Sequence, residues 1–219
     1  MRPRALAVVG LLVSSCAGVD ALSPSLRPPP SPAPMAEVLA TPRVAVPDPA
    51  RTRYDRAAYQ PRGWGDADGD GCNTREEVLL LEGEAVRTGP GCRVLGGHWQ
   101  DPFTGRRTTW PGDLQVDHLV ALADAYAHAS GGWAWPDERK VAFADDLGDP
   151  DELDAVWGAE NEAKADHGPD RWLPPDEKAR CWYVAAYARI KARWDLSVTP
   201  AQWAAVSSVW AACGPRVSP

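Results

Sequence analysis

Basic residues are in deficit in this chain of 219 residues, which has 23 Lys and Arg against 30 Asp and Glu and a formal net charge of −7. Removal of Arg2 and Arg4 with an export signal would make the balance more acidic. Phosphate contacts normally need a basic surface, so any binding to nucleic acid must depend on local clusters. The chain also lacks an internal repeat, and its apolar run from Ala5 to Val13 has only nine residues, too few for a permanent membrane span.

Cysteine is sparse as well, and none of the five cysteines is in a Cys-x-x-Cys arrangement. The spacing therefore argues against a zinc site. If Cys16 is taken by processing or lipid, four cysteines remain, and in an exported chain these are expected to form disulfides. Chain proximity predicts that Cys72 pairs with Cys92 and that Cys181 pairs with Cys213.

The start of the chain predicts export. Two arginines, an apolar run and small residues resemble a signal peptide over residues 1–21. The stretch from Val13 to Cys16 also matches a bacterial lipobox, so the two alternatives are lipidation at Cys16 and ordinary cleavage near Ala21. The protein is therefore expected to be secreted or to be anchored on the outer face of a bacterial membrane. Residues 22–52 are rich in proline and predict an extended linker.

The strongest chemical signal is the pair Asp117 and His118, followed about forty residues later by Asn161 and Lys164. Cutting a phosphodiester needs a base of near-neutral pKa and a divalent cation that neutralises charge on the phosphate. An ion such as Mg²⁺ keeps several waters, so one carboxylate and one amide oxygen are sufficient protein ligands. The alternative is that His118 is a hydrogen-bonded residue of the core, which is the commoner role for an isolated histidine in a strand.

Several short stretches together resemble the HNH, or His-Me finger, endonucleases, and most closely the secreted HNH proteins related to the C-terminal nuclease domain of GmrSD-type restriction enzymes. Their order and spacing make the likeness specific, and it covers about residues 53 to 213. The matching stretches are Gly63-Trp64, Asp-Gly-Asp-Gly-Cys-Asn-Thr-Arg-Glu-Glu-Val (68 to 78), Asp-Pro-Phe-Thr-Gly (101 to 105), Val-Asp-His-Leu-Val-Ala-Leu (116 to 122), Asn-Glu-Ala-Lys-Ala-Asp (161 to 166) and Trp-Leu-Pro-Pro (172 to 175).

The resemblance implies that His118 is the general base and that Asp117 and Asn161 are metal ligands. It implies a catalytic place for Lys164, either in contact with a phosphate or as a structural partner. The sequence departs from the family pattern at three points. Glu152 stands where the family has an Asn that braces the loop of the base, Ala165 replaces the usual Gly, and the family's Phe-Ala-Asn-Asp is here Phe-Ala-Asp-Asp (143 to 146).

The pattern of the chain predicts an α+β fold with a ββα-metal core, additional helices and disulfides, in a nuclease domain over residues 53–215. A hairpin is expected around residues 101–105. The core is expected from a strand over 114–120, a second strand over 153–156 and a helix over 158–166. A regular strand sends Asp117 and His118 to opposite faces, so both serve one site only if the strand ends or bends there. Residues that recur at helical spacing predict two C-terminal helices, with Thr199 capping the second.

An acidic loop fits the EF-hand calcium pattern, with Gly71 at the sharp turn. Glu77 has a second interpretation, since Thr74 and Glu77 would form a capping box for a helix over 75–84. The candidate calcium residues are Asp66, Asp68, Asp70, Cys72 and Glu77.

These patterns predict an exported endonuclease that uses Mg²⁺, with Mn²⁺ as an alternative, and they make residues 66–77 a candidate site for Ca²⁺. The expected partner is nucleic acid, with DNA favoured over RNA and with little sequence preference, and no obligate protein partner is indicated. The rival interpretation is a calcium-stabilised cell-surface binding module on the same fold without turnover. The cations available for phosphate contact are Arg106, Arg107, Arg171, Arg180, Arg189, Lys191 and Arg193.

Overall fold

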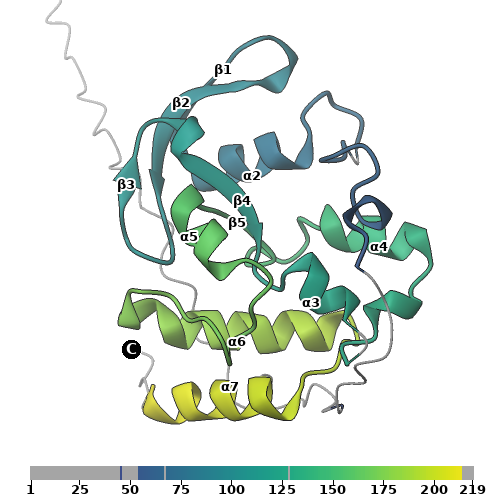
Figure 1. Ribbon diagram of the computed structural model, residues 1–219. Helices are drawn as coiled ribbons and strands as arrows, with labels where there is room; N and C mark the ends of the chain where they lie inside the picture. The colour runs from purple at the N-terminus through teal and green to yellow at the C-terminus, as the bar shows by residue number, and fades with distance from the viewer. Residues whose placement is uncertain (1–44, 46–53, 67, 128, 214–219) are drawn as a thin grey trace, which may run out of the picture.

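The computed structural model describes residue 45 and residues 54–66, 68–127 and 129–213. The predicted signal peptide, Cys16 and, apart from residue 45, the proline-rich linker lie outside these residues. The described part is a mixed α+β structure, as expected, with two small sheets and helices packed around them (Figure 1). None of the helices in this part is both long and apolar enough to span a bilayer.

Five strands form two separate antiparallel sheets. The first sheet has the order β1 (Glu84–Thr88), β2 (Val94–Gln100), β3 (Arg107–Thr108). The predicted hairpin around residues 101–105 is confirmed, because β2 and β3 pair across it. The second sheet is a pair of strands far apart in sequence, β4 (Leu114–His118) and β5 (Leu153–Trp157).

Helices cover these sheets and build the lower half of the molecule (Figure 1). The two long C-terminal helices lie side by side, and Thr199 caps the second of them in a capping box, as expected. The elements are η1 (Arg56–Ala58), α2 (Thr74–Glu82), η2 (Pro90–Cys92), η3 (Pro111–Asp113), α3 (Leu122–Tyr126), η4 (Gly132–Ala134), α4 (Asp137–Ala144), α5 (Gly158–Lys164), α6 (Glu177–Arg193) and α7 (Pro200–Ala212).

The start of α2 differs from the sequence-based expectation. Asn73, and not Thr74, is the N-cap, because its side chain accepts a hydrogen bond from the Glu76 amide. The Thr74 hydroxyl instead donates to the carbonyl of Gly65, which anchors the segment before the acidic loop. The predicted capping box of Thr74 and Glu77 is therefore wrong, and the local hydrogen bonds of Asn73 explain why. The helix also ends earlier, since Glu84 begins β1.

Two apolar clusters hold the described part together. The larger cluster joins α3, α4, α6 and α7 and includes the fully buried Tyr183, Tyr187 and Ile190, which recur at helical spacing along α6. The smaller cluster joins α2, β2, β4 and β5. Val116 of β4 and Ala155 of β5 belong to the smaller cluster, whereas Leu119, just after β4, and Val156 of β5 belong to the larger one. The β4–β5 sheet therefore lies between the two clusters.

Both predicted disulfides are confirmed. Cys72 and Cys92 join the acidic loop to η2, just before β2, with a Cα to Cα distance of 5.0 Å. Cys181 and Cys213 join α6 to the end of α7 at 5.9 Å. Each bond closes a loop in the chain, which stabilises the fold chiefly by restricting the unfolded state.

Candidate functional site

Strand β4 presents its side chains to different neighbours on its two faces. Val116 packs with α2 in the smaller apolar cluster. Gln115 and Asp117 alternate with it, and both contact α5 on the opposite face. Gln115 meets Asn161, and Asp117 meets Lys164 one helical turn further along. The face of β4 that α5 covers therefore brings together three of the four residues that the sequence singled out.

A buried ammonium group links the end of β4 to α5. Lys164 is 0% exposed and donates hydrogen bonds to Oδ1 of Asp117, at 2.9 Å, and to the backbone carbonyl of His118, at 2.8 Å. Oδ2 of Asp117 is also 2.9 Å from the nitrogen, but it accepts no directed hydrogen bond from any described residue. Burial raises the pKa of the Asp117 carboxyl above its usual value, and the charge of Lys164 partly offsets this.

This geometry decides between the two roles expected for Lys164. A side chain with no exposed surface does not reach a phosphate, so Lys164 is an internal structural partner in this structure. It fixes the Asp117 carboxylate and the backbone of His118 at once. Ala165, which directly follows, has a φ of 48°, a region that an L side chain rarely adopts, and this accounts for the Gly at that position in the family pattern.

His118 lies on the other side of β4 from Asp117. It is 6% exposed, its ring stacks between Trp64, at 5.2 Å between centroids, and Phe143, at 6.5 Å, and its Nε2 is 2.8 Å from the carbonyl oxygen of Ala144. A carbonyl only accepts, so Nε2 carries the hydrogen and Nδ1 is the basic nitrogen. Burial lowers the pKa of His118 to about 3, so the imidazole is neutral at pH 7.

Asn161 is held by a residue that the sequence did not single out. Its Nδ2 donates to Oε1 of Gln115 at 2.8 Å, which orients the amide group on the surface of α5. Gln115 was detectable in principle, because a residue two positions before Asp117 shares its face of the strand. Within the described residues, the imidazole of His118 makes no hydrogen bond or ion pair with Asn161 or with the Asp117 carboxylate. Their convergence on one ion remains a prediction.

Trp64 is the second residue whose place the sequence did not reveal. Its position over His118 is set by Gly65, whose amide donates to Oδ1 of Asp145 at 3.1 Å and whose carbonyl accepts from the Thr74 amide at 2.7 Å. A Cβ atom at Gly65 would lie 2.5 Å from Oδ2 of Asp145, so only glycine allows this close approach. The segment before the acidic loop is thereby held against the ends of α2 and α4.

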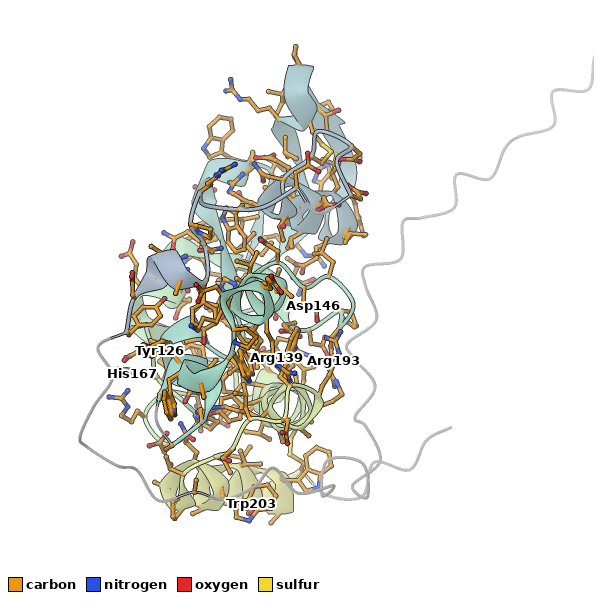
Figure 2. The ribbon with its side chains drawn as sticks, turned by 90° about the vertical axis from the view of Figure 1, so that its right-hand side faces the viewer. Tyr126, Arg139, Asp146, His167, Arg193 and Trp203 are labelled. Carbon is orange, nitrogen blue, oxygen red and sulfur yellow. A yellow bond between two sulfur atoms is a disulfide. The ribbon has the colours of Figure 1, made fainter. Side chains whose placement is uncertain are left out.

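Glu152, which stands at the position of the bracing Asn, acts through its backbone. Its carbonyl accepts the Leu119 amide at 3.0 Å and so supports the chain just after His118. Its side chain points instead to α6 and accepts hydrogen bonds from Arg193 and from Trp194 Nε1, both at 2.9 Å. Arg193 also pairs with Asp146, which Figure 2 shows beside it. Burial, then the neighbouring Asp146, raise the pKa of Glu152 to about 9, although Arg193 favours the charged form.

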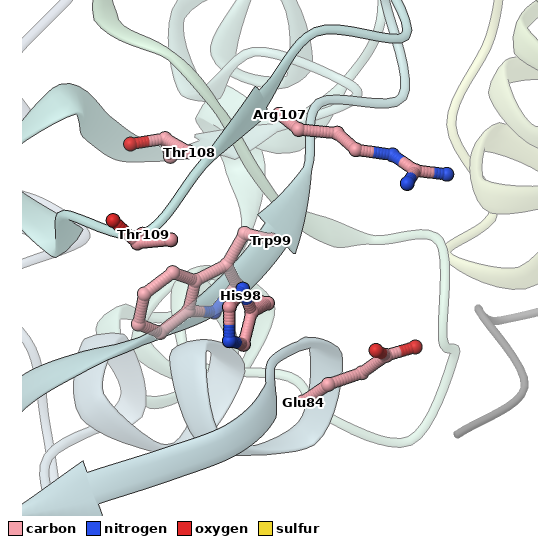
Figure 3. Close-up of a pocket in the computed structure, with 6 residues that line it drawn as sticks. All are labelled: Glu84, His98, Trp99, Arg107, Thr108 and Thr109. Carbon is pink, nitrogen blue, oxygen red and sulfur yellow. The ribbon is translucent and has the colours of Figure 1, made fainter. Parts of the chain in front are cut away.

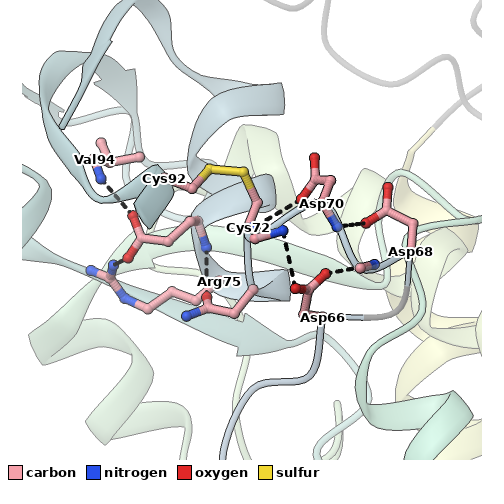
Figure 4. The surroundings of a disulfide bond; sticks show 11 residues. Asp66, Asp68, Asp70, Cys72, Arg75, Cys92 and Val94 are labelled. Atoms are coloured by element: carbon pink, nitrogen blue, oxygen red, sulfur yellow. Dashed lines mark hydrogen bonds and ion pairs between the residues drawn. A yellow bond between two sulfur atoms is a disulfide. The ribbon is translucent and has the colours of Figure 1, made fainter. Parts of the chain in front are cut away.

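The acidic loop has the compact turn that the calcium pattern predicts (Figure 4). Asp66 accepts hydrogen bonds from the amides of Gly69, at 2.9 Å, and Gly71, at 3.1 Å, and Gly71 has a φ of +92°. Oxygen atoms of Asp66, Asp68 and Asp70 lie within 4.8 Å of one another. The converging group consists only of exposed carboxylates, as far as the structure describes it. Their negative charges repel one another, and a bound cation would remove this repulsion.

The negative charges of this loop affect the carboxyl group of Glu77. Partial burial, followed by the charges of Asp68, Asp70, Asp66 and Asp145, raises the pKa of Glu77. Cys72, the seventh position of the pattern, is fixed by its disulfide to Cys92. The capping role predicted for Glu77 is not formed, and its place as a calcium ligand remains a prediction.

Most of the basic run on α6 is used inside the protein. Arg189 forms ion pairs with Asp149, at 2.8 Å, and Asp151, at 2.5 Å. Lys191 is 0% exposed and pairs with Asp124 at 3.1 Å. These cations therefore tie α6 to its neighbours and do not form the nucleic-acid surface considered for them from sequence.

Arg106 and Arg107 are placed differently. Both are exposed, and the guanidinium of Arg106 lies 3.8 Å from the ring centroid of Trp157, the last residue of β5. Trp157 directly precedes α5, which carries Asn161. A stacked guanidinium is held in place while keeping its charge, so Arg106 supplies fixed positive charge next to the start of α5.

The buried pair predicts a large loss of stability for Lys164→Met. Removing the ammonium leaves Asp117 uncompensated in a dry site, so the free energy of unfolding should fall by about 3–5 kcal/mol. Urea unfolding of this variant is the measurement, with Lys178→Met, an exposed lysine on α6, as the matched control. Adding Asp117→Asn should recover part of the loss; equal, small losses for both lysine variants would show that the pair contributes little.

The depressed pKa of His118 predicts a loss of stability in mild acid. Because the unfolded chain binds a proton near pH 6.5 and the folded chain only near pH 3, stability falls as pH is lowered through this window. Between pH 7 and 4.5 the wild type should lose about 2–3 kcal/mol more than His118→Gln. Urea unfolding of both proteins at each pH tests this, and the difference between them should be constant above pH 7. Parallel losses in acid would contradict a buried neutral His118.

No model of a known protein family matches the chain, and no solved structure matches it. A relative described as "Uncharacterized secreted protein" from Arthroderma benhamiae is 37% identical over 142 residues, which are 65% of this chain and 68% of the relative. The relative's description supports the expectation that this protein is exported. By this similarity, the chain belongs to the same family as the secreted protein of Arthroderma benhamiae.

Proposed function

We propose that this protein is an exported, metal-dependent HNH endonuclease that hydrolyses phosphodiester bonds of nucleic acids, with DNA favoured over RNA. Its ββα-metal core would consist of β4, β5 and α5. Export would end either in secretion or in anchoring through a lipidated Cys16, which lies outside the described residues.

The observation that carries this proposal is the arrangement at the end of β4. Asp117 and His118 are the last residues of the strand, where it pairs with Asp154 and Leu153 of β5. Helix α5 follows β5 directly and packs on the Asp117 face, with Asn161 toward its exposed side. Two antiparallel strands and a following helix, with these side chains at their junction, are what the HNH resemblance leads one to expect.

The donor atoms near α5 fit a hard divalent cation. Oδ2 of Asp117 accepts no directed hydrogen bond, although it lies 2.9 Å from the Lys164 nitrogen. Gln115 engages the amide nitrogen of Asn161, which leaves the amide oxygen as the ligand atom. One carboxylate and one amide oxygen suit Mg²⁺, or Mn²⁺, which takes its other ligands from water and phosphate. When bound, the ion would neutralise charge that develops on the phosphate and the departing 3′ oxygen.

His118 has the protonation state and the tautomer that a general base requires. It is neutral at pH 7, and the carbonyl of Ala144 holds the hydrogen on Nε2, so Nδ1 would accept the proton of the attacking water. A pKa near 3 makes a weak base, but an anionic phosphate beside the ring would raise it toward neutrality. Trp64 covers the ring, so substrate would have to displace Trp64 to reach it.

A second candidate is the calcium-stabilised surface module without turnover. The convergence of Asp66, Asp68 and Asp70 favours a structural calcium ion. The two candidates differ in whether the end of β4 performs chemistry, and they share the calcium loop.

The endonuclease proposal predicts different defects for His118→Ala and Asn161→Ala. Loss of the base should reduce plasmid nicking by about 10² to 10⁴ at every metal concentration. Loss of a ligand should give a defect that shrinks as Mg²⁺ or Mn²⁺ is raised. The measurement is nicking of plasmid, linear DNA and RNA by the purified protein against metal concentration, with EDTA as the blank.

Two control variants make this assay specific. His167→Ala removes a half-exposed histidine beyond the end of α5, and Glu162→Ala removes an exposed side chain next to Asn161. Both should cleave like the wild type. Full activity of folded His118→Ala would overturn the assigned base, and wild-type protein that does not cleave would favour the binding module.

The calcium loop predicts that Ca²⁺ raises the melting temperature, because a ligand bound only by the folded state stabilises that state. Asp68→Ala should abolish the rise, whereas Glu138→Ala, an exposed carboxylate on α4, should retain it. Thermal melts in EDTA and in millimolar Ca²⁺ measure the effect. An identical wild-type melt in both solutions would mean that the loop folds without calcium.

A further inference from the structure

A pocket of about 430 Å³ lies on the β1–β2–β3 sheet (Figure 3), and neither Asp117 nor His118 lines it. Its volume is in the range of small-molecule sites. Nothing in the endonuclease mechanism uses it. It is lined by Glu84, His98, Trp99, Arg107, Thr108 and Thr109.

The strand register places three different functional groups on one face of this sheet. Glu84 of β1 is directly opposite His98 of β2, and Arg107 of β3 is opposite Gln100, two residues further along β2. Residues two apart on a strand share a face, so His98 lies between the carboxylate and the guanidinium. Figure 3 shows Glu84 and Arg107 reaching toward the same side of the pocket.

Glu84 and Arg107 each keep hydrogen-bonding capacity that the rest of the described chain does not satisfy. Oε1 of Glu84 is shielded from solvent yet accepts no hydrogen bond from a described residue. The side chain of Arg107 is exposed, and it forms no ion pair with any residue that the structure describes. Trp99, in contrast, alternates with His98 to the other face of β2, where its Nε1 donates to the Leu79 carbonyl at 2.9 Å. The pocket therefore contains an acceptor, Oε1 of Glu84, and a donor, the Arg107 guanidinium, that no described residue engages.

Neighbouring residues lead from the pocket to the start of α5, the helix that carries Asn161. Arg107 follows Arg106, whose guanidinium stacks on Trp157 at 3.8 Å, and Trp157 leads into α5 and Asn161. A strand of nucleic acid whose phosphate is at Asn161 would pass the charge of Arg106 before it reached the pocket.

We propose that this pocket binds a guanine base of single-stranded nucleic acid. The inference rests on the proposed function, since it takes nucleic acid as the substrate. Guanine presents N1–H and N2–H donors to a carboxylate and O6 and N7 acceptors to an arginine, which matches Glu84 and Arg107. The exposed imidazole of His98 offers a face on which the base stacks.

The other bases fit this pair less well. Adenine and cytosine each place a ring nitrogen acceptor beside their amino group, which repels a carboxylate, and thymine and uracil flank a single N–H with two carbonyl oxygens. In a duplex the Watson–Crick edge of guanine is already paired, so Glu84 selects an unpaired base. The preference concerns one base and leaves binding of the remaining nucleotides independent of sequence.

The test is binding, measured by fluorescence anisotropy in EDTA so that no cleavage is needed. The probes are oligothymidine strands with a single central guanine, adenine, cytosine or thymine. Wild-type protein should bind the guanine strand about tenfold more tightly than the others, a difference typical of one well-recognised base. Glu84→Gln should remove the preference, because the amide lacks the second acceptor oxygen.

Arginine variants separate recognition of the base from general charge. Arg107→Lys keeps the charge but loses the two-pronged donor, so it should bind all four strands alike at the wild-type level for thymine. Arg93→Ala, which removes an exposed arginine near the other end of β2, should weaken all four equally and keep the preference. Melting temperatures of the variants confirm that each is folded.

The outcomes distinguish this inference from the endonuclease proposal. A guanine preference in EDTA without cleavage in Mg²⁺ would support the pocket and overturn the nuclease. Cleavage in Mg²⁺ with equal binding of all four strands would support the nuclease and overturn the pocket. A preference that survives both Glu84→Gln and Arg107→Lys would also overturn the pocket, because another surface would then carry it.

Discussion

The buried Lys164 ammonium is the interaction on which the end of β4 depends. Removing such a charge from water costs several kcal/mol, and here one carboxylate and one backbone carbonyl offset that cost. The result is geometric: α5 cannot shift along β4 without leaving the ammonium or Asp117 unpaired. Asn161 is one helical turn before Lys164, so its distance from Asp117 is fixed by the same contact. The chain tolerates a strained φ at Ala165 to end the helix directly after this residue.

The distribution of charge follows the same principle. Lys164, Lys191, Arg189 and Arg193 all pair with carboxylates inside or between elements, so they contribute to the fold and little to the outer field. An acidic protein that attracts phosphate must then do so with the few cations left exposed. Arg106 meets this need because its stack on Trp157 holds the charge near α5 at little entropic cost. The formal net charge is therefore a poor guide to the potential at one edge of the protein.

The sequence predicted what depends on local pattern and failed where distant segments meet. Alternation and turn residues indicated the hairpin near residue 103 and the strand β4, and chain proximity gave both disulfide pairs. The burial of Lys164 was not predictable, because spacing places a residue on a helix face without saying what covers that face. Trp64 over His118 joins residues 54 positions apart. The cap of α2 moved by one residue because Asn73 and Thr74 are both good caps and the carbonyl of Gly65 engaged Thr74.

The opposite placement of Asp117 and His118 is the constraint that any chemistry at this site must meet. A regular strand separates the two side chains, and although β4 ends at His118, the Leu119 amide still donates to the carbonyl of Glu152, the next partner in the same register. The backbone there is held by Lys164 on one side and by the Glu152 carbonyl on the other, so the imidazole, and not the backbone, is the part that can be uncovered. Trp64 is what covers it, and the anchors of Trp64 at Asp145 and Thr74 flank the acidic loop that starts at Asp66. Trp64 and Asp66 are separated by a single glycine. The conformation of the acidic loop therefore influences the position of Trp64, and with it the access of other molecules to the His118 ring.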